Sequence, residues 1–241
     1  MRPSTAPRAG SAFALAVLLA AACSSGPPVP DWQQEAHAAL QRATQAQLAG
    51  DSRVAQAEHA RARRALSSTA RADRVALAEL TRCAGELATL ASLDSPGAGA
   101  AACPAFEPLR ADAGPAAAAY ADFLGGPVDA TRVALLPAAQ QAAAAAGADG
   151  PRREAAVRAI ADPLSRLVAA GAALRDGAAT PGLVALAVET ASAQGWRRAL
   201  LAWLTVQRKL AEAAGDAEAA AAIRRRIELA GPPPSAPSGV R

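Results

Sequence analysis

The chain has 241 residues, of which 25 are basic and 21 acidic, and its formal net charge is +4. That length suffices for one domain or two small ones. The small basic excess argues against a nucleic-acid partner. Lys209 is the only lysine, and we interpret the numerous arginines as solvated helix faces rather than as one basic patch. Aromatic residues make up only 3% of the chain, so we expect a thin hydrophobic core.

The first 22 residues have the three parts of a secretory signal peptide. Arg2 and Arg8 provide a basic start, the uncharged run 12–22 (AFALAVLLAAA) follows, and small residues precede Cys23. The apolar run is too short to span a bilayer core, which takes about 20 apolar residues. Without the two arginines, the basic excess of the chain halves. The alternative is an ordinary signal peptide cut nearby, with Cys23 incidental.

The segment 19–23 (LAAAC) resembles the bacterial lipobox, in which small residues precede an obligatory cysteine, although Ala20 stands where that family usually has Leu. The resemblance implies cleavage before Cys23 and a lipid anchor on its sulfur, followed by a flexible tether at 23–30. In Gram-negative bacteria an Asp after the cysteine favours retention in the inner membrane. Ser24 is not Asp, so the resemblance implies an outer-membrane lipoprotein that faces the periplasm.

Two cysteines remain once Cys23 carries lipid. Cys83 and Cys103 are then an even pair in an oxidising compartment, and we expect a disulfide between them. On the chain-entropy model, closing a loop of about 20 residues stabilises the fold by on the order of 3 kcal/mol. The alternative is two reduced thiols, one of them buried in a helix. No histidine is near either cysteine in sequence, so we expect no metal site there.

From residue 31 to about 230, nearly every segment has the pattern of a helix. Asp31 is expected to cap the first helix, whose apolar residues repeat with a period of 3.6 until Gly50 ends it. Asp51 is expected to cap a second helix that runs to about Thr69. A third helix begins near residue 71 and contains Cys83. A loop at 94–104 and two short pieces, at 106–112 and 115–124, follow.

The strongest interruption is the segment 125–127 (GGP), a candidate boundary between two halves of the domain. Next comes an alanine-rich stretch at 130–146, which Pro137 should kink or divide. An Asp-Pro and a Thr-Pro pair open helices at 163–175 and 181–194. Trp196 begins a long helix to about 214, a Gly-Asp turn leads into a last helix that ends near Leu229, and the tail 231–241 should be disordered.

A helix, a Gly-Asp turn and a second helix occur at 50–51 and again at 215–216. The first turn resembles the tetratricopeptide repeat, whose second helix carries small, bulky and small residues at the spacing of Ala55, His59 and Ala62. Arg42 departs from that pattern, and no period of about 34 residues links the two turns. No alternating run predicts a strand. We therefore predict an all-α fold, an irregular stack of helical hairpins that forms a tetratricopeptide-like solenoid or a bundle.

The residues show no catalytic, cofactor or metal motif. His37 and His59 lie on the first two helices, where Glu35 or Glu58 could add a ligand, but their spacing matches no compact metal site and we expect a structural role. Acidic residues stand beside arginines on helix faces, as Glu79 does with Arg82, and we interpret such pairs as solvated.

Trp196 and Trp203 are seven residues apart and share one helix face. We expect Trp203 in the core between the last two helices and Trp196 partly exposed, which makes Trp196 a candidate residue for binding a partner. The expected function is a non-enzymatic scaffold or assembly factor that binds an envelope protein, as the resemblance to tetratricopeptide-like outer-membrane lipoproteins implies. The alternative is a periplasmic small-ligand or lipid-binding protein. An apolar cavity would favour the alternative, and a concave groove would favour the scaffold.

Overall fold

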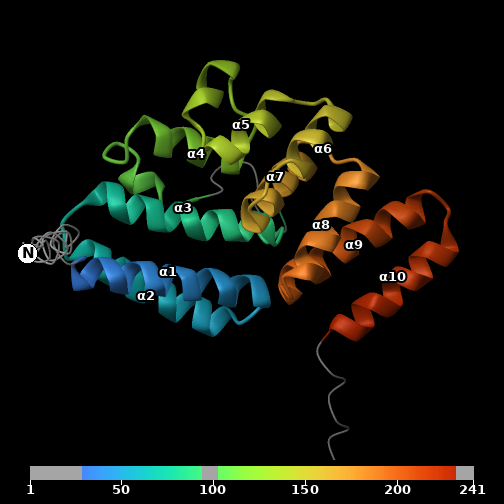
Figure 1. Ribbon diagram of the computed structural model, residues 1–241, viewed down its shortest axis with the longest axis horizontal. Coiled ribbons are helices and arrows are strands. Elements are labelled where there is room, and N and C mark those ends of the chain that lie inside the picture. The colour runs from blue at the N-terminus through green and yellow to red at the C-terminus, as the bar shows by residue number, and fades with distance from the viewer. Residues whose placement is uncertain (1–28, 94–102, 232–241) are drawn as a thin grey trace, which may run out of the picture.

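The computed structural model describes residues 29–93 and 103–231, and within these ranges it contains helices and no strand (Figure 1). The all-α prediction is therefore confirmed. The expected signal peptide, Cys23, most of the tether and the tail 232–241 lie outside the described residues. Among the described helices, none combines the length and the apolar character needed to span a membrane. The α-helices are α1 (Asp31–Ala49), α2 (Ser52–Ser67), α3 (Ala72–Ala88), α4 (Pro115–Gly125), α5 (Ala138–Ala145), α6 (Gly150–Arg158), α7 (Pro163–Arg175), α8 (Pro181–Ala193), α9 (Arg197–Ala213) and α10 (Ala217–Ala230), and the 3₁₀ helices are η1 (Glu107–Leu109) and η2 (Ala130–Leu135).

Both Gly-Asp turns form as predicted. Gly50 has a φ of +101°, a left-handed conformation that favours glycine, and the carboxylate of Asp51 accepts a 3.1 Å hydrogen bond from the amide of Val54. Gly215 has a φ of +73°, and Asp216 caps α10 in the same way. The one capping prediction that fails is Asp31: it is the first residue of α1 after Pro30, and its charge lies in the first turn, where an anion is favourable.

Short polar residues before a proline set the starts of the later helices. Asp162 accepts a hydrogen bond from the amide of Ser165 at 2.7 Å, and Thr180 caps α8 through its hydroxyl. Pro137 divides the alanine-rich stretch into η2 and α5, as expected. Helix α6 was not predicted, although Asp149 caps it and a proline follows in its first turn.

The helices pack in a bundle-like arrangement (Figure 1). The hairpin of α1 and α2 lies against α3, which also contacts α4 and α7. The chain then continues through α5 to α8, and α9 returns to contact α1. Two hydrogen bonds join these distant helices: the indole of Trp196 donates to Gln45 at 3.1 Å, and Arg198 donates to the carbonyl of Gly50 at 3.3 Å.

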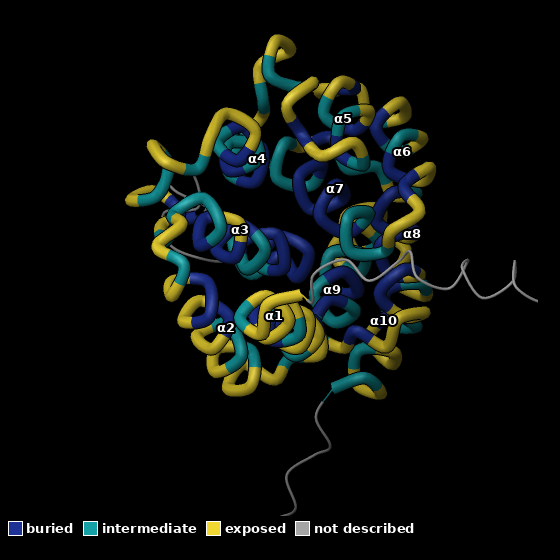
Figure 2. The backbone as a smooth tube through the Cα atoms, turned by 60° about the vertical axis from the view of Figure 1, so that its left-hand side comes forward, coloured by how far each residue is buried: buried dark blue, intermediate teal, exposed yellow. Residues whose placement is uncertain are grey.

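The buried residues concentrate on α3, α7 and α8 (Figure 2). Helices α3 and α7 approach closely at Gly171, where an added Cβ would lie 2.6 Å from the carbonyl oxygen of Leu87. Phe123, just before the candidate boundary at 125–127, belongs to the same hydrophobic cluster as Leu167 on α7. The Gly-Gly-Pro segment therefore does not separate two hydrophobic cores.

The two tryptophans of α9 are both buried. Trp203 is 0% exposed, so its predicted core position is confirmed, although its hydrogen bond reaches Ala88 at the end of α3 rather than α10. Trp196 is only 7% exposed, and the prediction that it would be partly exposed is wrong. The reason is the packing of α9 on α1, which covers the indole and pairs its N–H with Gln45.

Cys83 and Cys103 form the predicted disulfide. Their Cα atoms lie 5.7 Å apart, within the normal range for a disulfide, and both residues are buried. The bond attaches the segment before η1 to α3.

Candidate binding groove

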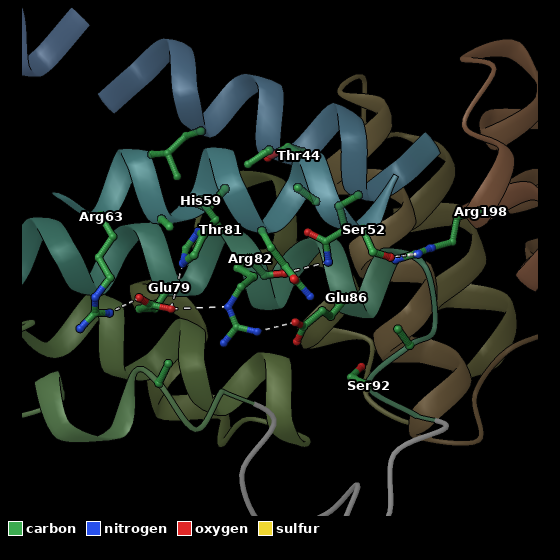
Figure 3. A pocket seen from close by; sticks show the side chains of 18 residues that line it. Thr44, Ser52, His59, Arg63, Glu79, Thr81, Arg82, Glu86, Ser92 and Arg198 are labelled. Carbon is green, nitrogen blue, oxygen red and sulfur yellow. Dashed lines mark hydrogen bonds and ion pairs between the residues drawn. The ribbon is translucent and has the colours of Figure 1, made fainter. Parts of the chain in front are cut away.

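An open cavity of about 590 Å³ lies along α2 and α3 (Figure 3). Side chains from α1, α2 and α3 line most of it, and Arg198 of α9 reaches one end. We call this cavity the groove. Its lining combines charged side chains with hydroxyl and amide groups and with the small side chains of alanines.

Glu79 of α3 is the central charged residue of the groove. Its side chain is 2% exposed, and three cationic or potentially cationic groups surround its carboxylate. Nε2 of His59 lies 3.2 Å from Oε2, Nη1 of Arg63 pairs with Oε1, and Nε of Arg82 lies 3.5 Å from Oε2. An ionised carboxylate only accepts hydrogen bonds, so His59 must donate from Nε2.

The three partners reach Glu79 because of helical spacing. His59 and Arg63 are four residues apart on α2 and therefore share one face, which packs towards α3. Arg82 is three residues after Glu79 on the same helix. The cluster thus joins α2 to α3, and Arg63, the most exposed partner, keeps part of its guanidinium available to solvent.

The surroundings of Glu79 keep it ionised. Burial by itself raises the pKa of the Glu79 carboxyl group, but hydrogen bonds and positive charge from His59 and Arg63 outweigh burial and hold that pKa at about 2. A carboxylate stabilised in this way has little affinity for a proton at neutral pH. Glu79 is therefore suited to holding cationic side chains in place and is a weak general base.

A second set of contacts extends the charged lining. The guanidinium of Arg82 also pairs with Glu86, four residues further on, and the carbonyl of Arg82 accepts a 3.4 Å hydrogen bond from Gln47. Arg198 pairs with the hydroxyl of Ser52. The groove is thus lined by three arginines and by two carboxylates, and its net charge is positive even with a neutral imidazole.

The interpretation of Glu79 and Arg82 as a solvated pair is wrong. Glu79 lies four residues after Val75 and four before Cys83, both of which are buried, so it occupies the apolar stripe of α3. That position in the stripe is the signal from which its burial could have been inferred. The identity of its partners depends on how α2 packs and is not visible in the sequence.

The two histidines lie in different surroundings. His59 belongs to the groove, whereas His37 is exposed on α1. The acidic residues considered as further ligands are paired with arginines: Glu35 with Arg61 at 2.9 Å, and Glu58 with Arg42 at 2.7 Å. Within residues 29–93 and 103–231, no three His, Cys, Asp or Glu side chains are grouped in a way that could hold a metal ion.

The other predicted site residues lie outside the groove lining. Trp196 is buried between α9 and α1, and the Cys83–Cys103 disulfide is buried behind α3. Comparisons of the chain with known protein families, with curated proteins and with solved structures find no match.

Proposed function

We propose that this protein is a lipid-anchored envelope protein that binds a segment of another protein in the groove along α2 and α3, as a scaffold or assembly factor. The anchor is inferred from the signal-peptide pattern and from the lipobox-like segment before Cys23. The outer membrane, with the helical bundle in the periplasm, is the location that Ser24 favours.

The observation that carries the proposal is the set of charged side chains that line an open groove. Arg63, Arg82 and Arg198 outnumber Glu79 and Glu86, so the groove favours an acidic segment. An acyl chain needs an enclosed apolar cavity, whereas this groove is open and has five charged side chains in its lining. The groove therefore supports recognition of a polypeptide more than it supports the small-ligand or lipid alternative.

A binding role, rather than a catalytic one, is consistent with the chemistry of the cluster. The Glu79 carboxylate has a pKa of about 2, and His59 uses Nε2 in a hydrogen bond to it. Both groups are thus engaged in holding α2 and α3 together. We propose that their function is to fix the positions of Arg63 and Arg82, whose guanidiniums would contact acidic groups of the partner.

Photo-crosslinking in intact cells tests the groove. A photoreactive amino acid at Gln56, which is exposed and lines the groove, should give a discrete protein–protein adduct. The matched control is Ala57, which is exposed on the same helix but does not line the groove, and should give none. Reversing the charge with Arg63→Glu should remove the adduct formed from Gln56.

Two outcomes would contradict the protein-binding proposal. Equal adducts from positions 56 and 57 would show that the groove is not a specific site. A small molecule retained by the purified protein in native mass spectrometry, lost on Arg63→Glu and accompanied by no protein adduct, would favour the ligand-binding alternative.

The anchor is tested separately. Cys23→Ser removes the sulfur that the lipid would occupy, so the variant should neither incorporate labelled palmitate nor partition into detergent. Unchanged labelling of Cys23→Ser would rule out the lipoprotein assignment. The matched control is Ser24→Ala, which leaves the acylated sulfur in place and should label like the natural chain.

A further inference from the structure

A second cavity, of about 460 Å³, lies on a different part of the bundle, where the end of α4 and the turn between α5 and α6 meet the end of α7. None of its lining residues belongs to the groove. Its charged side chains are Arg153, Arg175 and Asp176, and its apolar side chains include Phe123 and Val128.

The charged side chains of this cavity are unusually buried. The side chain of Arg153 is 3% exposed, that of Arg175 is 11% exposed and that of Asp176 is 12% exposed. Oδ2 of Asp176 lies 2.8 Å from Nη2 of Arg153, and Oδ1 lies 2.8 Å from Nη2 of Arg175. In the described part of the chain, Asp176 is the only carboxylate paired with either arginine. One positive charge is therefore left over in a place where an uncompensated charge is costly.

Each arginine also donates hydrogen bonds to backbone carbonyls, but not every nitrogen of its guanidinium is paired. Nη1 of Arg153 donates to the carbonyl of Gly147 at 3.0 Å, and Nη1 of Arg175 donates to the carbonyls of Phe123 and Leu124 at 2.8 and 2.9 Å. Among the described residues, buried Nε of Arg153 has no hydrogen-bond partner, and Nη2 of Arg175 has only its ion pair. The site therefore has spare positive charge, and two of its buried guanidinium nitrogens have no hydrogen-bond acceptor among the described residues.

The electrostatics of the pair are consistent with this excess. Burial lowers the pKa of the Arg175 guanidinium, Asp176 opposes that effect, and the positive charge of Arg153 lowers the pKa further. A second anion beside the two guanidiniums would relieve their mutual repulsion.

We infer that this cavity is a binding site for a small organic anion, whose carboxylate or phosphate group contacts Arg153 and Arg175. The apolar part of the ligand then lies against Pro127 and Val128, and the volume of the cavity is that of a small-molecule site. Two guanidiniums that share one carboxylate are suited to planar or tetrahedral oxyanions because their donors are arranged in a fixed fork.

Isothermal titration calorimetry on the full-length chain in a nonionic detergent tests the site. The probes are benzoate and inorganic phosphate, each titrated in Tris-chloride at constant ionic strength. We expect saturable binding of one probe molecule per chain. Tighter binding of benzoate identifies the ligand as a carboxylate with an apolar body, and binding of phosphate alone identifies it as a phosphate.

A matched pair of variants locates the binding. Ala148 is exposed and lines the cavity, so Ala148→Glu supplies a tethered carboxylate that competes with the probe and should weaken binding at least tenfold. Ala142→Glu makes the same change of charge at an exposed position of α5 outside the lining and should bind the probe like the natural chain. Arg153→Gln removes one guanidinium and should also weaken binding at least tenfold.

The result that overturns the inference is the absence of saturable binding for both probes, or equal affinities in Ala148→Glu and Ala142→Glu. Circular dichroism checks that each variant is folded. If Arg153→Gln unfolds, the two glutamate variants decide alone, because both change exposed alanines. Crosslinking from Gln56 should persist in Ala148→Glu, so failure of this inference is distinguishable from failure of the proposed groove function.

Discussion

The indole N–H of Trp203 on α9 donates a 3.1 Å hydrogen bond to the carbonyl oxygen of Ala88, the last residue of α3. The carbonyls of the three preceding residues accept hydrogen bonds from the amides of Thr89, Leu90 and Ala91, as is usual at a helix end. Trp203 and Ala88 are both 0% exposed. The indole of α9 therefore provides a hydrogen-bond donor for a carbonyl of α3 that water cannot reach. Helix α9 thus stabilises the C-terminal end of α3.

Replacing Trp203 should destabilise the bundle strongly. Trp203→Ala removes the largest fully buried side chain and should lower the free energy of unfolding by about 3–5 kcal/mol. Trp203→Phe keeps a ring but leaves the Ala88 carbonyl without its donor, which should cost about 1–3 kcal/mol. Urea denaturation followed by circular dichroism measures both changes. The hydrogen bond from Trp196 to Gln45 is only partly buried, so Trp196→Phe should lower the free energy of unfolding less. An unchanged unfolding midpoint in Trp203→Ala would contradict the core assignment.

Gly171 should not tolerate a methyl group. An alanine Cβ there would lie 2.6 Å from the carbonyl oxygen of Leu87, so α3 and α7 would have to separate. We expect Gly171→Ala to lower the free energy of unfolding by about 1–3 kcal/mol, although alanine is the better helix former. The control is Gly182→Ala on α8, where the nearest atoms belong to the flexible carboxylate of Glu154. That side chain can move, so the control should have a much smaller effect on thermal unfolding.

Ala70 offers a stabilising substitution. It is exposed and has a φ of +54°, a left-handed conformation in which the Cβ of an L-residue is crowded. Ala70→Gly should raise the free energy of unfolding by about 1 kcal/mol. Ala57→Gly, at an exposed position inside α2, should lower it by about 1 kcal/mol. The melting temperatures of the two variants, measured by differential scanning calorimetry, should therefore move in opposite directions from that of the natural chain. A shift in the same direction would show that the backbone conformation of Ala70 does not limit stability.

The ionisation of Glu79 predicts a specific loss of stability in acid. Because the folded-state pKa of about 2 is below the ordinary value of 4.5, the ionised carboxylate stabilises the folded state fully above about pH 4.5. That contribution, on the order of 3 kcal/mol, is lost as the pH falls from about 4.5 towards 2. The difference in unfolding free energy between the natural chain and Glu79→Gln should therefore shrink across this interval. A difference that is independent of pH from 7 to 2 would show that the charge of Glu79 contributes little.

The disulfide should be a measurable part of the stability. The natural chain, denatured without reductant, should show no reactive thiol at Cys83 or Cys103. Replacing both with alanine should lower the free energy of unfolding by about 3 kcal/mol, because 20 positions separate the two cysteines along the chain. Full reactivity of both thiols in the natural chain would exclude the bond.

The local features of this protein can be predicted from its amino-acid sequence alone. Helix starts at Asp51, Asp162 and Thr180 follow from side chains that cap the amides three residues later, and the helix end at Gly50 follows from a left-handed glycine. The division at Pro137 has an equally local cause, since proline cannot donate the hydrogen bond that a continuous helix needs. Such interactions involve residues a few positions apart, so they can be predicted before the chain is folded.

Which polar residues are buried, and what they contact, depends on how the helices pack against one another. The position of Glu79 in the apolar stripe of α3 can be recognised from the sequence, but its low pKa depends on the packing of α2 against α3. Trp196 is covered because α9 returns to α1, and Arg153 meets Asp176 because α6 packs beside the end of α7. Burial and pairing of this kind are set by helices that are distant along the chain. The residue pattern of a single helix does not predict which other helix will pack against its apolar face.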